Sequence, residues 1–184
     1  LLSEEGMSVR SLEEKIEMYD LPFKPKDRCK LILIEPDSVL DRYSAGDRSL
    51  LEYSVMNIAE ETLRPHYHVW PAKNKRGLMI ALIKPDRIGE LSAAHCAETL
   101  AQLQNNVRRY LKINLSLFVS KELDFPEGLS QSYWKGVAML KVRSGDPDGA
   151  MILEHGEGPF APRTETLRTL RQTPSLLQLA ESKD

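Results

Sequence analysis

Two uninterrupted apolar segments place the strongest constraint on the fold of this chain. Residues 29–35, CKLILIE, are rich in apolar and β-branched side chains over the length of a strand, and Pro36 follows them. Residues 78–83, LMIALI, are apolar on both faces of a strand. A strand of this kind has no polar face to turn toward water. We therefore expect both segments inside a sheet, with residues 29–35 as its buried central strand.

The spacing of apolar residues predicts the other helices and strands. Leu51, Val55, Ile58 and Thr62 recur on one face of a helix that begins near Asp47. Apolar and polar residues alternate over INLSLFV, which indicates a half-buried strand. In total, we expect helices over residues 47–64, 88–110 and 129–144, and further strands over residues 67–70, 113–119 and 150–154.

The order of these elements is β-α-β-β-α-β, followed by α-β. With 184 residues and 41% hydrophobic content, the chain can bury one good core. This order favours an α+β fold with a mostly antiparallel sheet and helices packed on one face, which is the ferredoxin-like plan.

Both ends of the chain are predicted to be helical extensions. A capping box of Ser11 and Glu14 begins an entry helix, and a second helical stretch, interrupted at Pro174, is expected near the end. The expected division is an N-terminal connector helix at 1–26, an α+β domain at 27–158 and a C-terminal extension at 159–184. Amphipathic terminal helices pair readily, so a homodimer through them is possible. The chain opens with LLSEEG, without an initiator methionine, and we expect it to be a fragment.

Charge and cysteine usage exclude several classes of function. The chain has 25 basic and 27 acidic residues, a formal charge of -2, so no global field favours nucleic acid or an acidic membrane. Cys29 and Cys96 lack the spacing of a zinc or redox site, which predicts two reduced core thiols. No apolar run approaches the ~18 residues of a membrane span, and no signal peptide is evident. We expect a cytoplasmic protein without membrane contact.

The turn between residues 67–70 and 78–83 carries three cations. Lys73, Lys75 and Arg76 could bind phosphate or a DNA backbone, but a solvated hairpin tip is the favoured interpretation. At the end of the first strand, Glu35 and Asp37 could be metal ligands. We favour strand-end and helix-capping roles for them, with Asp37 as the cap.

The histidines give only a weak signal of a metal site. His66 and His68 lie on the same side of a strand and could begin a metal site. A third ligand is not evident, because His95 lies in the middle of a predicted helix and His155 in a distant loop. No metal is therefore expected.

Three large aromatic side chains have two interpretations. Tyr67, Trp70 and Trp134 could line a small-molecule pocket, but packing in the core is favoured. No nucleophile elbow or phosphate-binding loop occurs in the sequence. We therefore expect no catalytic residue, and the sequence does not identify a small ligand.

One short phrase resembles a known enzyme family. AGDRSL, after an acid-ended first strand, resembles the GGDEF domain of diguanylate cyclases, whose first strand ends in a pattern close to DxDxFKxxND. In the corresponding stretch IEPDSVLDRYS, Glu35 and Asp37 occupy the acidic positions, but Leu40 and Tyr43 replace the nucleotide-contacting Lys and Asn. The signature turn is AKNKRG, without an acid. Cyclisation needs carboxylates that hold a divalent metal against the triphosphate, so the resemblance implies a degenerate, non-catalytic domain without a cofactor.

A wider resemblance covers nearly the whole chain. The phrases that carry it are, in order, SLEEKIEMYDLPF, LILIEPD, AGDRSLLEYSVMNIAEE, NVRRYLKINLSLFVS and SYWKGVAMLKVRSG. They resemble the central segment of large bacterial AraC-family transcriptional regulators, many of them two-component response regulators of the YesN type. There a degenerate GGDEF-like domain lies between a receiver or sensor region and paired helix-turn-helix units. The resemblance implies a regulatory domain that reaches DNA only through regions outside this chain.

A rival function remains open at this stage. The chain could be a divergent nucleotide-binding or c-di-GMP-binding domain that uses Glu35, Lys73, Lys75 and Arg76 for phosphate and metal. A third alternative is direct DNA binding by this segment alone, which predicts a steep dependence on salt.

Overall fold

The structure, a computed structural model, describes residues 22–74, 78–85, 93–143 and 149–154. The expected entry helix, the C-terminal extension and the beginning of the long helix at residues 88–92 lie outside these residues. Lys75, Arg76 and His155 lie outside them as well.

The described helices and strands follow one another in the expected order. They are β1 (Arg28–Pro36), η1 (Ser38–Arg42), α2 (Ala45–Leu63), β2 (Tyr67–Lys73), β3 (Met79–Pro85), α3 (Ala93–Leu111), β4 (Leu115–Val119), β5 (Leu123–Asp124), α4 (Leu129–Arg143) and β6 (Met151–Leu153). The capping role expected of Asp37 implied the helical turn η1, whereas the short strand β5 was not predicted. The chain is therefore α+β, with three α-helices among the described residues.

The strands form one mixed sheet with β1 at its centre. Its order is β2-β3-β1-β4-β6, and β5 pairs with the beginning of β1. The pairs of β1 with β3 and β4 are antiparallel, whereas β4 and β6 are parallel. Ile32 of β1 lies between Ala81 of β3 and Val119 of β4. The expected interior positions of residues 29–35 and 78–83 are thus confirmed.

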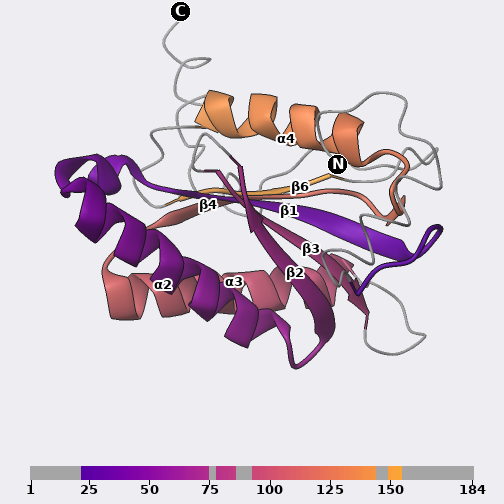
Figure 1. Ribbon diagram of the computed structural model, residues 1–184, viewed down its shortest axis with the longest axis horizontal. Coiled ribbons are helices and arrows are strands. Elements are labelled where there is room, and N and C mark those ends of the chain that lie inside the picture. The colour runs from indigo at the N-terminus through magenta and orange to yellow at the C-terminus, as the bar shows by residue number, and fades with distance from the viewer. Residues whose placement is uncertain (1–21, 75–77, 86–92, 144–148, 155–184) are drawn as a thin grey trace, which may run out of the picture.

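Helices cover both faces of this sheet, so the expectation of helices on one face is wrong. Figure 1 shows α2 and α3 on one side of the sheet and α4 on the other. Ile32 and Ile34 join the core beneath α2 and α3, whereas Leu31 and Leu33 join the core beneath α4. Phe118 also faces α4 and is fully buried, so β4 is not half-buried as expected. The apolar second face of β1 requires this additional cover.

The buried face of α2 differs from the predicted face, because most of its buried positions are shifted by one residue along the sequence. Ser44 caps the helix, because its hydroxyl accepts a hydrogen bond from the backbone N–H of Asp47. The buried positions are Glu52, Val55, Ala59 and Leu63. Leu51, Ile58 and Thr62, which were expected to face the core, are only partly buried. A charged residue therefore lies on the inner face of α2.

Both cysteines are buried, which confirms the prediction of core thiols. Burial, reinforced by nearby carboxylates that include Asp27, raises the pKa of the Cys29 thiol to about 12. Burial also raises the pKa of Cys96. Among the described residues, no helix is long and apolar enough to cross a membrane.

Gly136 allows α4 to approach the sheet closely. A Cβ atom at this position would lie 2.4 Å from Cδ1 of Phe118 and 2.7 Å from Cδ1 of Leu33. We expect Gly136→Ala to lower the free energy of unfolding by about 1–3 kcal/mol, because overpacking outweighs the better helix propensity of alanine. Urea denaturation measures this change.

Gly46 provides the matched control for this prediction. It lies in the first turn of α2, where the nearest atom to an added Cβ is Oγ of Ser44 at 4.0 Å. Gly46→Ala should leave stability nearly unchanged. If Gly136→Ala is as stable as the wild-type protein, the close packing of α4 on β1 and β4 is not a constraint on the fold.

Candidate functional site

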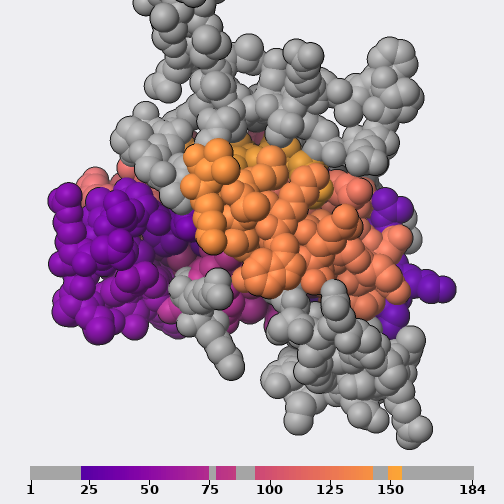
Figure 2. Space-filling view, turned by 90° about the horizontal axis from the view of Figure 1, so that it is seen from above, coloured from indigo at the N-terminus to yellow at the C-terminus, as the bar shows by residue number. Residues whose placement is uncertain are grey.

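A cleft opens beside the point where β1 ends. Its volume is about 680 Å³, within the range of about 300–1,000 Å³ that is typical of small-molecule sites. The end of β1, η1, the first half of α2, the start of the β2–β3 turn and one side of α4 contribute its lining. In the view from above, the surface of α4 lies beside that of η1 and α2 (Figure 2).

The two acids at the end of β1 both line this cleft, but Asp37 does not cap the turn that follows. Asp37 occupies the N-cap position of η1 without a capping hydrogen bond from its side chain. Its Oδ2 instead accepts long hydrogen bonds from the backbone N and from Nδ2 of Asn114, at 3.3 and 3.4 Å. The predicted cap is therefore wrong. Asp37 N–H also donates to the carbonyl of Asn114, so backbone and side-chain hydrogen bonds hold the two residues together.

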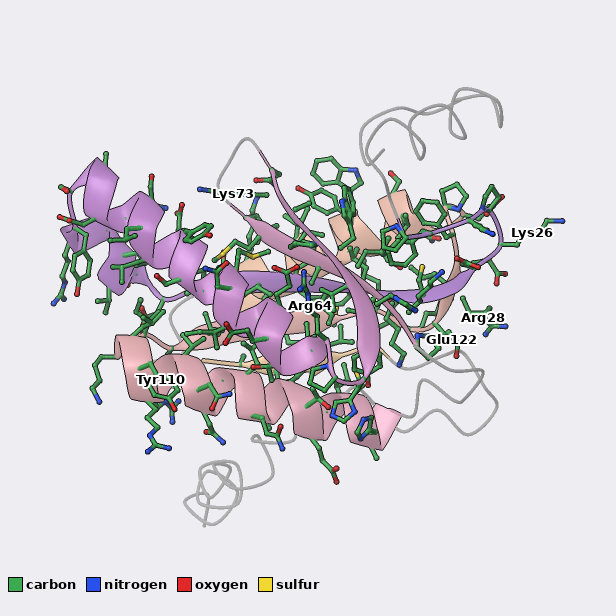
Figure 3. The ribbon with its side chains drawn as sticks, turned by 60° about the horizontal axis from the view of Figure 1, so that its bottom comes forward. Lys26, Arg28, Arg64, Lys73, Tyr110 and Glu122 are labelled. Carbon is green, nitrogen blue, oxygen red and sulfur yellow. The ribbon has the colours of Figure 1, made fainter. Side chains whose placement is uncertain are left out.

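Four charged side chains form a chain of ion pairs along the cleft. Arg48 of α2 donates through Nη1 to Asp41 of η1 at 2.9 Å and through Nε to Glu52 at 3.0 Å. The ammonium group of Lys73, at the end of β2, donates to the other oxygen of Glu52. Figure 3 shows Lys73 on the hairpin, beside α2. Lys73 is 45% exposed, and it is also the partner of a buried acid, whereas Lys75 and Arg76 of the predicted hairpin tip lie outside the described residues.

The electrostatics of Glu52 follow from this pairing. Its side chain is only 7% exposed. Burial alone would raise the pKa of the carboxyl, but the hydrogen bonds from Lys73 and Arg48 outweigh it, and the pKa falls below its usual value. The hydrogen bond to Glu52 in turn raises the pKa of Arg48. These groups keep their charges because they neutralise one another.

The opposite wall of the cleft is aromatic. The rings of Tyr133 and Trp134 on α4 meet edge to face, with centroids 5.1 Å apart and an interplanar angle of 76°. Asn74 donates from Nδ2 to the Tyr133 hydroxyl at 2.7 Å. Trp134 is 54% exposed. The expected packing role fits Tyr67 and Trp70, which contact the two cores, but not Trp134, which lines the cleft.

The histidines lie near the end of α2, whereas the cleft is lined by the first half of this helix. His66 precedes β2 and contacts His95 near the beginning of α3, with perpendicular rings whose centroids are 4.5 Å apart. The expected position of His95 within a helix gave no indication of this contact. His68 pairs in register with Lys84. Within the part of the chain that the structure describes, no group of three or more metal-ligating residues is present.

Sequence reasoning missed Asp41, Arg48 and Glu52. One signal was available, because Arg48 and Glu52 are four residues apart on a predicted helix and such pairs contact each other. The contacts of Glu52 with Lys73 and of Asn74 with Tyr133 join residues far apart in sequence. No local pattern indicates pairs of this kind.

Comparison with models of known protein families finds no match for this chain, and comparison with curated proteins finds none either.

Glu52 should contribute to stability in a pH-dependent way. Because its folded-state pKa lies below the usual 4.5, the contribution is complete above that pH and is lost as the pH falls through the folded-state value. We expect Glu52→Gln to lower the free energy of unfolding at pH 7 by about 1–3 kcal/mol. The deficit should shrink on acidification below pH 4.5, as measured by urea denaturation.

Asp41→Asn is the matched control, because Asp41 contacts the same arginine but its side chain is 66% exposed. Exposed ion pairs contribute only about 0–1 kcal/mol, so this variant should remain close to the wild-type protein. An equal loss of stability in the two variants at pH 7 would contradict the role assigned to burial.

Proposed function

We propose that the chain is a non-catalytic, GGDEF-like regulatory domain of an AraC-family transcriptional regulator of the YesN type. In this role it passes a signal from a sensor or receiver region to DNA-binding units that lie outside the chain. It acts in the cytoplasm, and its terminal segments, which lie outside the described residues, contribute to a homodimer. The input signal and target genes are not part of the proposal.

The arrangement of the sheet supports the part of this proposal that concerns the fold, which we propose is ferredoxin-like. The first four long strands lie in the order β2-β3-β1-β4 and are antiparallel to their neighbours. The two connecting helices, α2 and α3, lie on the same face (Figure 1). This is the order and layering of a β-α-β-β-α-β unit. Helix α4 and strand β6 add a second layer and an edge strand to it.

The ion pairs of the cleft carry the functional part of the proposal. The rival function requires Lys73 to bind phosphate, but Lys73 is already bound to Glu52, which also holds Arg48. Transfer of either cation to a triphosphate would remove one of the two partners of the Glu52 carboxylate, whose side chain is only 7% exposed, which is costly. At the acidic positions, Asp37 is engaged by Asn114. These contacts support a structural role for the charged groups at this site over the binding of a metal-bound nucleotide.

Calorimetric titration tests the proposal directly. With GTP or c-di-GMP in the presence of Mg²⁺, we expect no heat of binding and no turnover of GTP. The reason is that Arg48 and Lys73, beside the cleft, are held by Asp41 and Glu52.

The rival function predicts the opposite outcome in the same titration. Micromolar binding that is lost in Glu35→Ala, and kept in Glu61→Ala at an exposed position of α2, would contradict the proposal. A gel shift with steep salt dependence would instead indicate direct DNA binding.

The reading frame around the chain gives a second test, because tandem helix-turn-helix units after Asp184 are expected and their absence would overturn the assignment.

A further inference from the structure

The charges along the cleft are matched, and this matching limits the class of ligand that the cleft can accept. Asp41 and Glu52 are both bound to Arg48, and Glu52 is also bound to Lys73. The two acids at the end of β1 are engaged by contacts of their own. A fully charged ligand would therefore have to break an existing contact in order to gain a counter-charge.

Lys141 is the remaining cation of the described lining. It lies at an exposed position of α4, where water screens its charge, so it offers an anion only a weak contact. An uncharged molecule loses less hydration than an ion when it enters a cleft of this kind. The described lining thus favours an uncharged ligand.

The ion pair of Arg48 and Asp41 can still bind hydroxyl groups. Within the described part of the chain, Arg48 donates through Nε and Nη1 and Asp41 accepts at Oδ1, so Nη2 and Oδ2 make no hydrogen bond. The two side chains are 43% and 66% exposed, so a ligand can reach both. A guanidinium only donates hydrogen bonds and a carboxylate only accepts them, whereas a hydroxyl does both. Two neighbouring hydroxyls of one ligand therefore match this donor and this acceptor together.

The aromatic wall complements such a ligand. Trp134 is 54% exposed, and its edge-to-face contact with Tyr133 covers at most one face of the indole. An aromatic face is negative, so the weakly positive C–H groups on the face of a sugar ring pack favourably against it. The Tyr133 hydroxyl accepts a hydrogen bond from Asn74 and keeps its own hydrogen to donate.

We propose that the cleft binds an uncharged, polyhydroxylated ring compound of the size of a mono- or disaccharide. Its hydroxyl edge lies against Arg48 and Asp41, and its C–H face lies on Trp134. The volume of about 680 Å³ accommodates a molecule of this size. The binding site follows from the cleft itself, whereas its use as the input of a regulatory domain rests on the proposed function.

Fluorescence of Trp134 provides the test. The chain contains two tryptophans, so Trp70→Phe leaves Trp134 as the only one. In this background, titration with a panel of glucose, xylose, maltose, cellobiose and myo-inositol should give a saturable change in emission with at least one member. Glucuronate and protonated glucosamine, which add a negative and a positive charge to a sugar ring, should give none at the same concentrations.

Three variants locate the bound sugar, with calorimetry as the readout. Trp134→Leu should abolish binding, and Asp41→Ala should weaken it about tenfold or more through the loss of a hydrogen bond to a charged group. Both side chains are exposed, so both variants should fold. Glu61→Ala is the matched control, because Glu61 is exposed on α2 and lies outside the lining of the cleft. Its binding should equal that of the wild-type protein.

The outcomes separate this inference from the regulatory role. No saturation by any sugar of the panel, equal binding of either charged analogue, or unchanged binding in Trp134→Leu or Asp41→Ala would overturn the inference. If the sugars fail while GTP and c-di-GMP also give no binding, the regulatory role stands without this ligand. If a sugar binds but no helix-turn-helix units follow Asp184, the site stands and the regulatory role is overturned.

Discussion

The burial of β1 on both faces is the constraint on which the other features depend. This strand is hydrogen-bonded to β3 on one side and β4 on the other, and its side chains enter two separate cores. A shift of one residue would exchange Ile32 and Ile34 with Leu31 and Leu33 between these cores. The register therefore fixes where β1 ends, and with it the place of the cleft. Glu35 lies opposite Ser116 for this reason.

The burial of Glu52 then determines what the cleft can do. Its place on the inner face of α2 would be unfavourable for a lone carboxylate. Arg48 and Lys73 compensate it from the same helix and from the hairpin, so α2 and β2 are linked by charge as well as by packing. This arrangement makes the cations structural groups.

The elements of the fold were predictable where one local pattern decided them. The apolar segments 29–35 and 78–83 indicated interior strands, and the structure places them there. The same segments also require a second covering layer, because both of their faces are apolar. The prediction of helices on one face missed this layer, because it followed from the element order of the ferredoxin-like plan. The site was less predictable, because its defining contacts join residues distant in sequence. Glu52 reaches Lys73 over 21 positions, and Asn74 meets Tyr133 from another element.

A double-mutant cycle between Glu52 and Lys73 tests most directly whether the charges of the cleft neutralise one another. The free energies of unfolding of Glu52→Gln, Lys73→Met and the double variant would be compared with that of the wild-type protein at pH 7. We predict a favourable coupling energy of about 1 kcal/mol or more, as found for residues within one ion-pair network. Additivity of the two changes within about 0.5 kcal/mol would contradict the account, because Lys73 would then be free to serve an incoming phosphate.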